Sequence, residues 1–172
     1  MGKPKLEAIK FAAEIISSVA IIILLSGCKA TDNTQQQKTL AEKYFRGVYG
    51  SDSTVVDELC TDDIVVSYPI IQQLFNKPAI RGRDAVRHFA SGFSNRWSDT
   101  KIKFHEAIAE SNKVVLVWSF QGRNIGSPSP DVQPTEKVKS WGGITLIRFN
   151  KAGKIVAEIG EESEPGPFER LK

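Results

Sequence analysis

Apolar residues in the first half of the chain recur with the period of an α-helix. The segment 38–49 carries them on a single helical face, and Gly50 follows as a typical C-terminal cap. We therefore predict an amphipathic helix over 38–49. The apolar positions of this segment are Leu40, Ala41, Tyr44, Phe45 and Val48.

Shorter elements follow up to residue 97. Ser51 to Ser53 offer caps for a second short helix that runs through Cys60, and the β-branched segment Ile64 to Tyr68 predicts a strand that Pro69 stops. A loop is expected from there to Ile80. A third helix is predicted from Gly82 onward, with its apolar face formed by Val86, Phe89, Ala90, Phe93 and Trp97.

The hydrophobic period then changes from 3.6 to two, which is the period of β-strands. Four strands are predicted, and Gly142-Gly143 suggests a bulge or bend in the third of them. A proline-containing loop is expected over 127–134. The predicted strands cover 102–108, 113–121, 137–149 and 154–162.

Three helices followed by long antiparallel strands predict an α+β domain in which the helices cover one face of the sheet. Strongly bent strands give a cone-shaped half-barrel. Such a curved sheet leaves a hollow under the three N-terminal helices, and this hollow is the expected place for a ligand.

The N-terminus predicts a secretory signal. Lys3, Lys5 and Lys10 precede the apolar segment 15–25, and small residues follow it. A spanning helix needs about 20 apolar residues, and extending this one so far would bury Lys10 and Glu14. These two could partly neutralise each other, so an uncleaved signal anchor remains the alternative.

Leu25-Ser26-Gly27-Cys28 resembles the lipobox of bacterial lipoproteins. The resemblance implies cleavage before Cys28 and fatty acylation, including palmitate, on that residue. The membrane partner would then be the outer membrane on its periplasmic face in a Gram-negative cell, or the outer face of the plasma membrane in a Gram-positive cell. The expected divisions are 1–27 signal peptide, 28–37 tether, 38–164 domain and 165–172 tail.

Charge and cysteine content exclude several functions. The formal net charge is only +3, without basic runs, which argues against nucleic acid as a partner. Cys60 would be the single free thiol of the mature chain, and we expect it in the core. No metal-ligand spacing or cofactor motif is present, so we expect no metal and no cofactor.

Several weak motifs, in order and at matching spacing, resemble the SnoaL-like group of the nuclear transport factor 2-like superfamily. They are Leu59-Cys60-Thr61-Asp62-Asp63, Gly82-Arg83-Asp84-Ala85-Val86, Pro134-Thr135 with Val138, Ile147-Arg148-Phe149 and Gly153-Lys154-Ile155. The resemblance covers roughly 40–162 and implies a cone-shaped fold with a deep pocket. The group includes isomerases, cyclases, epoxide hydrolases and members without chemistry, so the fold alone does not give the function.

The resemblance argues against ketosteroid isomerase activity. Tyr68 stands where those enzymes carry a general-base aspartate, and Thr145 stands where they carry a protonated acid. Their tyrosine donor corresponds to Tyr44. Because a neutral tyrosine is a poor base, proton abstraction of that kind is not expected.

Cyclases and epoxide hydrolases of the group use a carboxylate deep in the pocket, near the end of the last strand. The usual positions are Gly160 and Ser163 here, and neither is acidic. Glu161 or Glu162, with Tyr68, are the candidate catalytic residues. Strand parity separates Glu161 from Glu158 and Glu162, and which of the three carboxylates faces inward stays open.

Two main hypotheses therefore compete. One is a lipid-anchored binding module for a small apolar molecule, and the other is an enzyme with a pocket carboxylate and a tyrosine. A third is an assembly protein that forms a homodimer through the outer sheet face. The expected ligand pocket is lined by Tyr44, Tyr68, Trp118, Phe120, Trp141 and Thr145.

Overall fold

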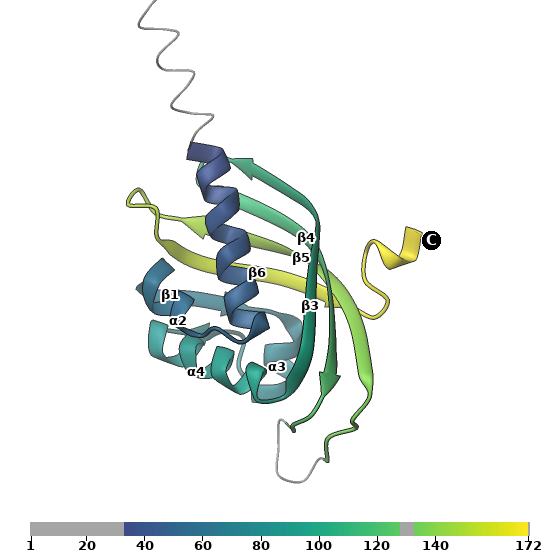
Figure 1. Cartoon of the computed structure of the whole chain (residues 1–172). Helices are drawn as coiled ribbons and strands as arrows, with labels where there is room; N and C mark the ends of the chain where they lie inside the picture. Colours follow the sequence, from purple (N-terminus) through teal and green to yellow (C-terminus); the bar gives the residue numbers. More distant parts are fainter. Residues whose placement is uncertain (1–32, 128–132, 172) are drawn as a thin grey trace, which may run out of the picture. The chain divides into compact units, whose positions relative to one another are not determined.

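The computed structural model describes residues 33–127 and 133–171 (Figure 1). The chain divides into two compact units, 1–36 and 37–172. Of the first unit only residues 33–36 are described, and they are helical. The predicted signal peptide and Cys28 lie outside the described residues, as does most of the predicted loop over 127–134. Within the described ranges, no helix is both long and apolar enough to cross a membrane.

The second unit is a mixed α+β domain, as the sequence predicts. A curved, unclosed sheet is covered on one face by helices (Figure 1). The helices are an N-terminal helix over 33–50, of which residues 37–50 belong to this unit, and α2 (Thr54–Leu59), α3 (Pro69–Phe75) and α4 (Arg83–Ser94). The six strands are β1 (Cys60–Ser67), β2 (Ile80–Arg81), β3 (Trp97–Glu110), β4 (Lys113–Asn124), β5 (Val138–Phe149) and β6 (Ile155–Ser163).

The strand order is β2-β1-β6-β5-β4-β3, and only the β1–β6 pair is parallel. The three long strands β3, β4 and β5 curve around the N-terminal helix (Figure 1). Phe45 of that helix packs against Trp118 of β4, with ring centroids 4.9 Å apart. The core therefore lies between the helices and the concave face of the sheet.

The first two helices end differently from the prediction. The N-terminal helix includes Gly50, and the left-handed conformation falls on Ser51 at φ 95°. Cys60 does not end a helix, because the backbone turns extended there and opens β1. At the other end, the helix already includes residues 33–37 of the predicted tether, and Gln37 is buried.

The predicted loop between Pro69 and Ile80 is wrong for its first half. Pro69 occupies the first turn of α3, where a missing backbone N–H costs nothing, and Tyr68 before it is extended. Asn76 ends the helix in the left-handed conformation at φ 52°. As a result, α3 buries Ile71 and brings the Tyr68 ring over the sheet.

At Gly142-Gly143, where the sequence predicts a bulge or a bend, the structure has no bulge. The pairing of β5 with β4 and β6 continues through both glycines without a shift. A Cβ atom on Gly143 would lie 2.7 Å from the Trp118 ring, so the glycine permits close packing. The register shifts occur instead within β3, between Arg148 and Phe149, and between Cys60 and Val65 of β1.

The convex face of the sheet carries a row of apolar residues on paired strands. Ile108 pairs with Val115, Val115 with Leu146, and Leu146 with Ile159. Ile108 and Ile159 are exposed by 56% and 43%. Beside this row, the C-terminal segment folds back so that Phe168 stacks on His105, with ring centroids 4.0 Å apart.

Candidate functional site

All three tyrosines of the chain converge on the carboxylate of Glu158. Tyr44 Oη donates to Oε2 at 2.7 Å, while Tyr49 and Tyr68 donate to Oε1 at 2.8 and 2.7 Å. Tyr44 and Tyr49 come from the N-terminal helix, Tyr68 from the β1–α3 junction and Glu158 from β6. Glu158 is 0% exposed. The cluster thus joins three separate elements through one buried acid.

A second chain of polar contacts supports Tyr68. Trp118 Nε1 donates to Thr145 Oγ1 at 2.8 Å, and Thr145 Oγ1 lies 2.6 Å from Tyr68 Oη. Because Tyr68 gives its own hydrogen to Glu158, the Thr145 hydroxyl is the donor to Tyr68. The donors therefore run in one direction from Trp118 to the Glu158 carboxylate.

Burial raises the pKa of Glu158, because the charged form loses its hydration, although the three tyrosine hydroxyls act in the opposite direction. The pKa values of the tyrosines are also raised, first by burial and then by the nearby Glu158 charge. The hydroxyls therefore stay protonated at neutral pH and act as hydrogen-bond donors.

Glu158 should make stability depend on pH. Its folded pKa is above the unfolded value near 4.5, so its favourable contribution is fully present below about pH 4.5 and is lost as pH rises through the folded pKa. We expect the wild-type protein to lose stability relative to Glu158→Gln over that range. Urea denaturation of both proteins at a series of pH values measures the difference. A difference independent of pH would contradict this assignment.

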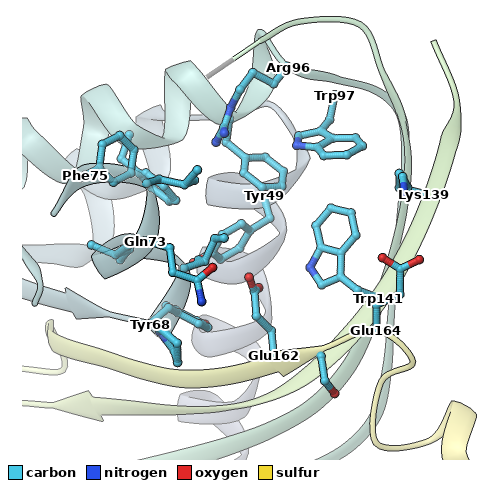
Figure 2. Close-up of a pocket in the computed structure, with 17 residues that line it drawn as sticks. Tyr49, Tyr68, Gln73, Phe75, Arg96, Trp97, Lys139, Trp141, Glu162 and Glu164 are labelled. Atoms are coloured by element: carbon cyan, nitrogen blue, oxygen red, sulfur yellow. The ribbon is translucent and has the colours of Figure 1, made fainter. Parts of the chain in front are cut away.

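An aromatic cavity of about 410 Å³ opens beside the cluster (Figure 2). Tyr49 and Tyr68, which both bind Glu158, form part of its wall. We call it the aromatic cavity. Its other lining residues are Pro69, Ile70, Ile71, Gln73, Leu74, Phe75, Phe89, Phe93, Arg96, Trp97, Lys139, Trp141, Glu162, Ser163 and Glu164.

Glu162 is the predicted catalytic acid that lines this cavity. Its carboxyl group projects into the space beside Trp141 (Figure 2). Burial raises the pKa of Glu162, a hydrogen bond from Trp141 lowers it, and the Glu158 charge raises it further. Glu161 alternates to the convex face, pairs with Ile144 and is exposed. Among the three acids of β6, Glu158 and Glu162 therefore share the concave face.

The predicted pocket residues divide into two groups. Tyr68 and Trp141 line the aromatic cavity. Tyr44, Trp118, Phe120 and Thr145 are fully or almost fully buried in the core and are not part of the lining. Phe120 nevertheless supports the wall, because its ring packs on Trp141 with centroids 4.2 Å apart.

Sequence reasoning missed Tyr49 as a functional residue. It follows Tyr44 by five positions, which places the two on different faces of an ideal helix. Its ring nevertheless packs against Phe93 of α4 at 5.2 Å and its hydroxyl group reaches Glu158. The one available signal was that the chain contains only three tyrosines, all within the first 68 residues.

Gly160 lies between Glu158 and Glu162 on the concave face of β6. A Cβ atom there would lie 2.1 Å from the ring of Tyr68. The tyrosine ring therefore occupies the volume that a side chain at position 160 would need.

Metal and thiol chemistry find no support in the described ranges. No group of three or more His, Cys, Asp or Glu side chains there could hold a metal ion. Cys60 is buried, and burial together with the Glu158 charge raises its pKa to about 12. The thiol is therefore protonated at neutral pH, as expected of a core cysteine.

The geometry defines a cone-shaped domain with an acid in an aromatic cavity, and comparisons with known proteins agree with this class. The profile of the SnoaL-like domain family matches residues 41–158. The chain therefore belongs to the SnoaL-like domain family. No curated protein sequence matches it.

Solved structures share the fold at low sequence identity. A candidate SnoaL-like polyketide cyclase from Jannaschia sp. CCS1 is 15% identical, with a TM-score of 0.63 over 76% of this chain and 88% of that one. SalBIII, an epoxide hydrolase/cyclase-like enzyme of pyran ring formation in salinomycin, is 18% identical, with a TM-score of 0.58 over 75% and 92%. An LEH-like epoxide hydrolase from M. tuberculosis is 14% identical, with a TM-score of 0.57 over 77% and 86%.

Proposed function

We propose that the protein is an acid–base enzyme that acts on a small, largely apolar molecule in the aromatic cavity, of the cyclase or epoxide hydrolase kind. The observation that carries the proposal is Glu162, a carboxyl group with a raised pKa in a wall of aromatic rings. A simple binding module needs the cavity but not this acid.

Glu162 is the general base in this proposal. In its ionised form it takes a proton from water or from carbon next to a carbonyl group. Tyr68 is the donor that stabilises negative charge developing on a substrate oxygen. Because Tyr68 donates its hydrogen to Glu158 in the structure, this role requires a protonated Glu158, whose own hydrogen would then go to the Tyr68 oxygen.

Turnover of apolar epoxides tests the proposal. The full-length protein in phosphatidylcholine nanodiscs is incubated with styrene oxide and with cyclic epoxides, and diol formation is followed by chromatography. We expect diol formation above that of empty nanodiscs. If epoxides bind to the protein but diol forms no faster than with empty nanodiscs, the binding module is favoured instead.

We propose in addition that a lipid on Cys28 anchors the protein to the cell envelope. The support is the lipobox-like segment 25–28 after a basic and apolar N-terminus. Mass spectrometry of protein from membranes should find an N-terminal peptide that begins at Cys28 and carries acyl chains. The Cys28→Ser variant should lack these chains. A wild-type peptide with an intact, unmodified Gly27–Cys28 bond would contradict the anchor.

Self-association is a second candidate function, and the apolar row on the convex sheet face favours it. Replacing both Ile144 and Ile159 by lysine would place charges on this face. We expect the wild-type particle to contain two copies and the variant particle one, measured by light scattering. A wild-type protein with one copy per particle would remove this candidate.

A further inference from the structure

A second cavity of about 560 Å³ adjoins the aromatic cavity. Phe75, Phe89 and Arg96 line both cavities and form the wall between them. The basic residues in the lining of the second cavity are Lys77, Arg81, His88 and Arg96. The described residues of this lining include no Asp or Glu. We call it the cationic cavity.

The cations of this cavity differ from the arginines of α4 in their carboxylate partners. Arg83 pairs with Asp62 at 2.6 Å, and Arg87 pairs with Asp57 at 3.1 Å and Asp84 at 2.9 Å. By contrast, no described carboxylate lies within 4.0 Å of a side-chain nitrogen of Lys77, Arg81 or Arg96. Of these described cations, the three without a carboxylate partner thus line the cavity, and the two paired arginines of α4 do not.

Arg96 is the innermost of these cations. It is half-buried, its Nε donates to the Gly92 carbonyl at 3.3 Å, and its guanidinium carbon lies 5.7 Å from the centre of the Phe93 ring. The guanidinium group points toward the aromatic cavity (Figure 2). Among the described residues only its Nε has a hydrogen-bond partner, and because Arg96 lines both cavities its guanidinium group lies at their shared wall, where a half-buried cation gains from a charge-assisted hydrogen bond to an anion.

The two cavities also differ in their acids. The lining of the aromatic cavity includes Glu162 and Glu164 as well as Arg96 and Lys139, whereas the described lining of the cationic cavity includes Lys77, Arg81 and Arg96 but no acid. Repulsion from Glu162 and attraction to Arg96 act on an anion in the same direction. A ligand with one apolar and one anionic end would therefore have a single favoured orientation.

We propose that the cationic cavity binds the carboxylate of an amphipathic ligand whose apolar part fills the aromatic cavity. This inference rests on the proposed function, because it names the class of molecule on which Glu162 acts. Arg96 holds the anionic group at the shared wall, and Lys77 and Arg81 add charge behind it. The reacting carbon atoms are thereby turned toward Glu162.

A matched pair of probes tests the inference. The full-length protein in phosphatidylcholine nanodiscs is titrated calorimetrically with 2-naphthoate and with 2-naphthamide, and empty nanodiscs give the background. The two probes share size and ring system and differ in charge. We expect 2-naphthoate to bind at least about tenfold more tightly at low ionic strength, as hydrogen bonds to a charged group imply.

Two double variants locate the anion. Lys77→Gln with Arg81→Gln should reduce the preference for 2-naphthoate at least about fivefold, because both cations line the cavity. Arg83→Gln with Arg87→Gln removes the same formal charge from α4 outside the cavity and should leave the preference within about twofold. Circular dichroism checks that both remain folded.

Each outcome has a separate meaning. Equal binding of both probes to the wild-type protein would overturn the anion site and leave the aromatic cavity of the proposed function intact. A preference that survives in the Lys77/Arg81 variant, or that falls equally in the control, would overturn the assignment to this cavity. Absence of binding by either probe would count against the proposed function as well.

Discussion

Replacing Glu158 by leucine is expected to lower the free energy of unfolding by about 3 kcal/mol or more, since a buried polar group left without a partner costs roughly 1–3 kcal/mol. Tyr44, Tyr49 and Tyr68 would each lose the acceptor of their hydroxyl group. Leucine has a similar volume, so the effect comes from unsatisfied hydroxyl groups rather than from a cavity. Urea denaturation of the full-length protein at neutral pH measures it.

Glu161→Leu is the matched control, because it is the same substitution at an exposed position of the same strand. Its effect should stay within about 0.5 kcal/mol. Glu158→Gln should lie between the two, because its amide keeps one oxygen acceptor for the tyrosines. Equal stabilities of the two leucine variants would show that the tyrosine cluster contributes little to the fold.

Replacing Glu162 by glutamine is expected to reduce turnover by about 10²–10⁴-fold, the range that general acid–base groups contribute. Ligand affinity should change little, since glutamine keeps the shape of the side chain. Because the base acts in its ionised form and its pKa is raised above 4.5, the wild-type rate should increase with pH through that raised value and fall as Glu158 loses the proton that frees Tyr68. Initial rates across pH measure both effects.

Glu164→Gln provides the control for this experiment. Glu164 also lines the aromatic cavity, but it is exposed and has no catalytic role in the proposal. Its turnover should stay close to that of the wild-type protein. Comparable losses in both variants would indicate a general effect of negative charge near the cavity rather than proton transfer by Glu162.

Periodicity was sufficient to predict most of the fold. The change from period 3.6 to period two places the helices before the long strands, and the α+β class follows from that order. The helix α3 was missed because Pro69 was interpreted only as the end of a strand. Proline fits the first turn of a helix equally well, and the sequence contains no stronger signal there.

Which glutamates of β6 point inward could not be predicted, because a register shift decides it. Counting from the hairpin turn, Phe149 pairs with Ile155, which would set Ile147 opposite Ala157 and turn Glu161 inward. The shift between Arg148 and Phe149 moves the register by one residue, so that Ile147 pairs with Glu158. A slip of one residue exchanges the faces of a strand, and the bulge is not visible in the sequence.

The contact between Tyr68 and Gly160 links two positions that are far apart in the chain. Because a Cβ atom at position 160 would lie 2.1 Å from the Tyr68 ring, this arrangement has no room for an acid at position 160 while the tyrosine ring stays in place. Homologues of this chain should therefore covary at these two sites. Introducing aspartate at position 160 would require a small residue at position 68 in the same variant.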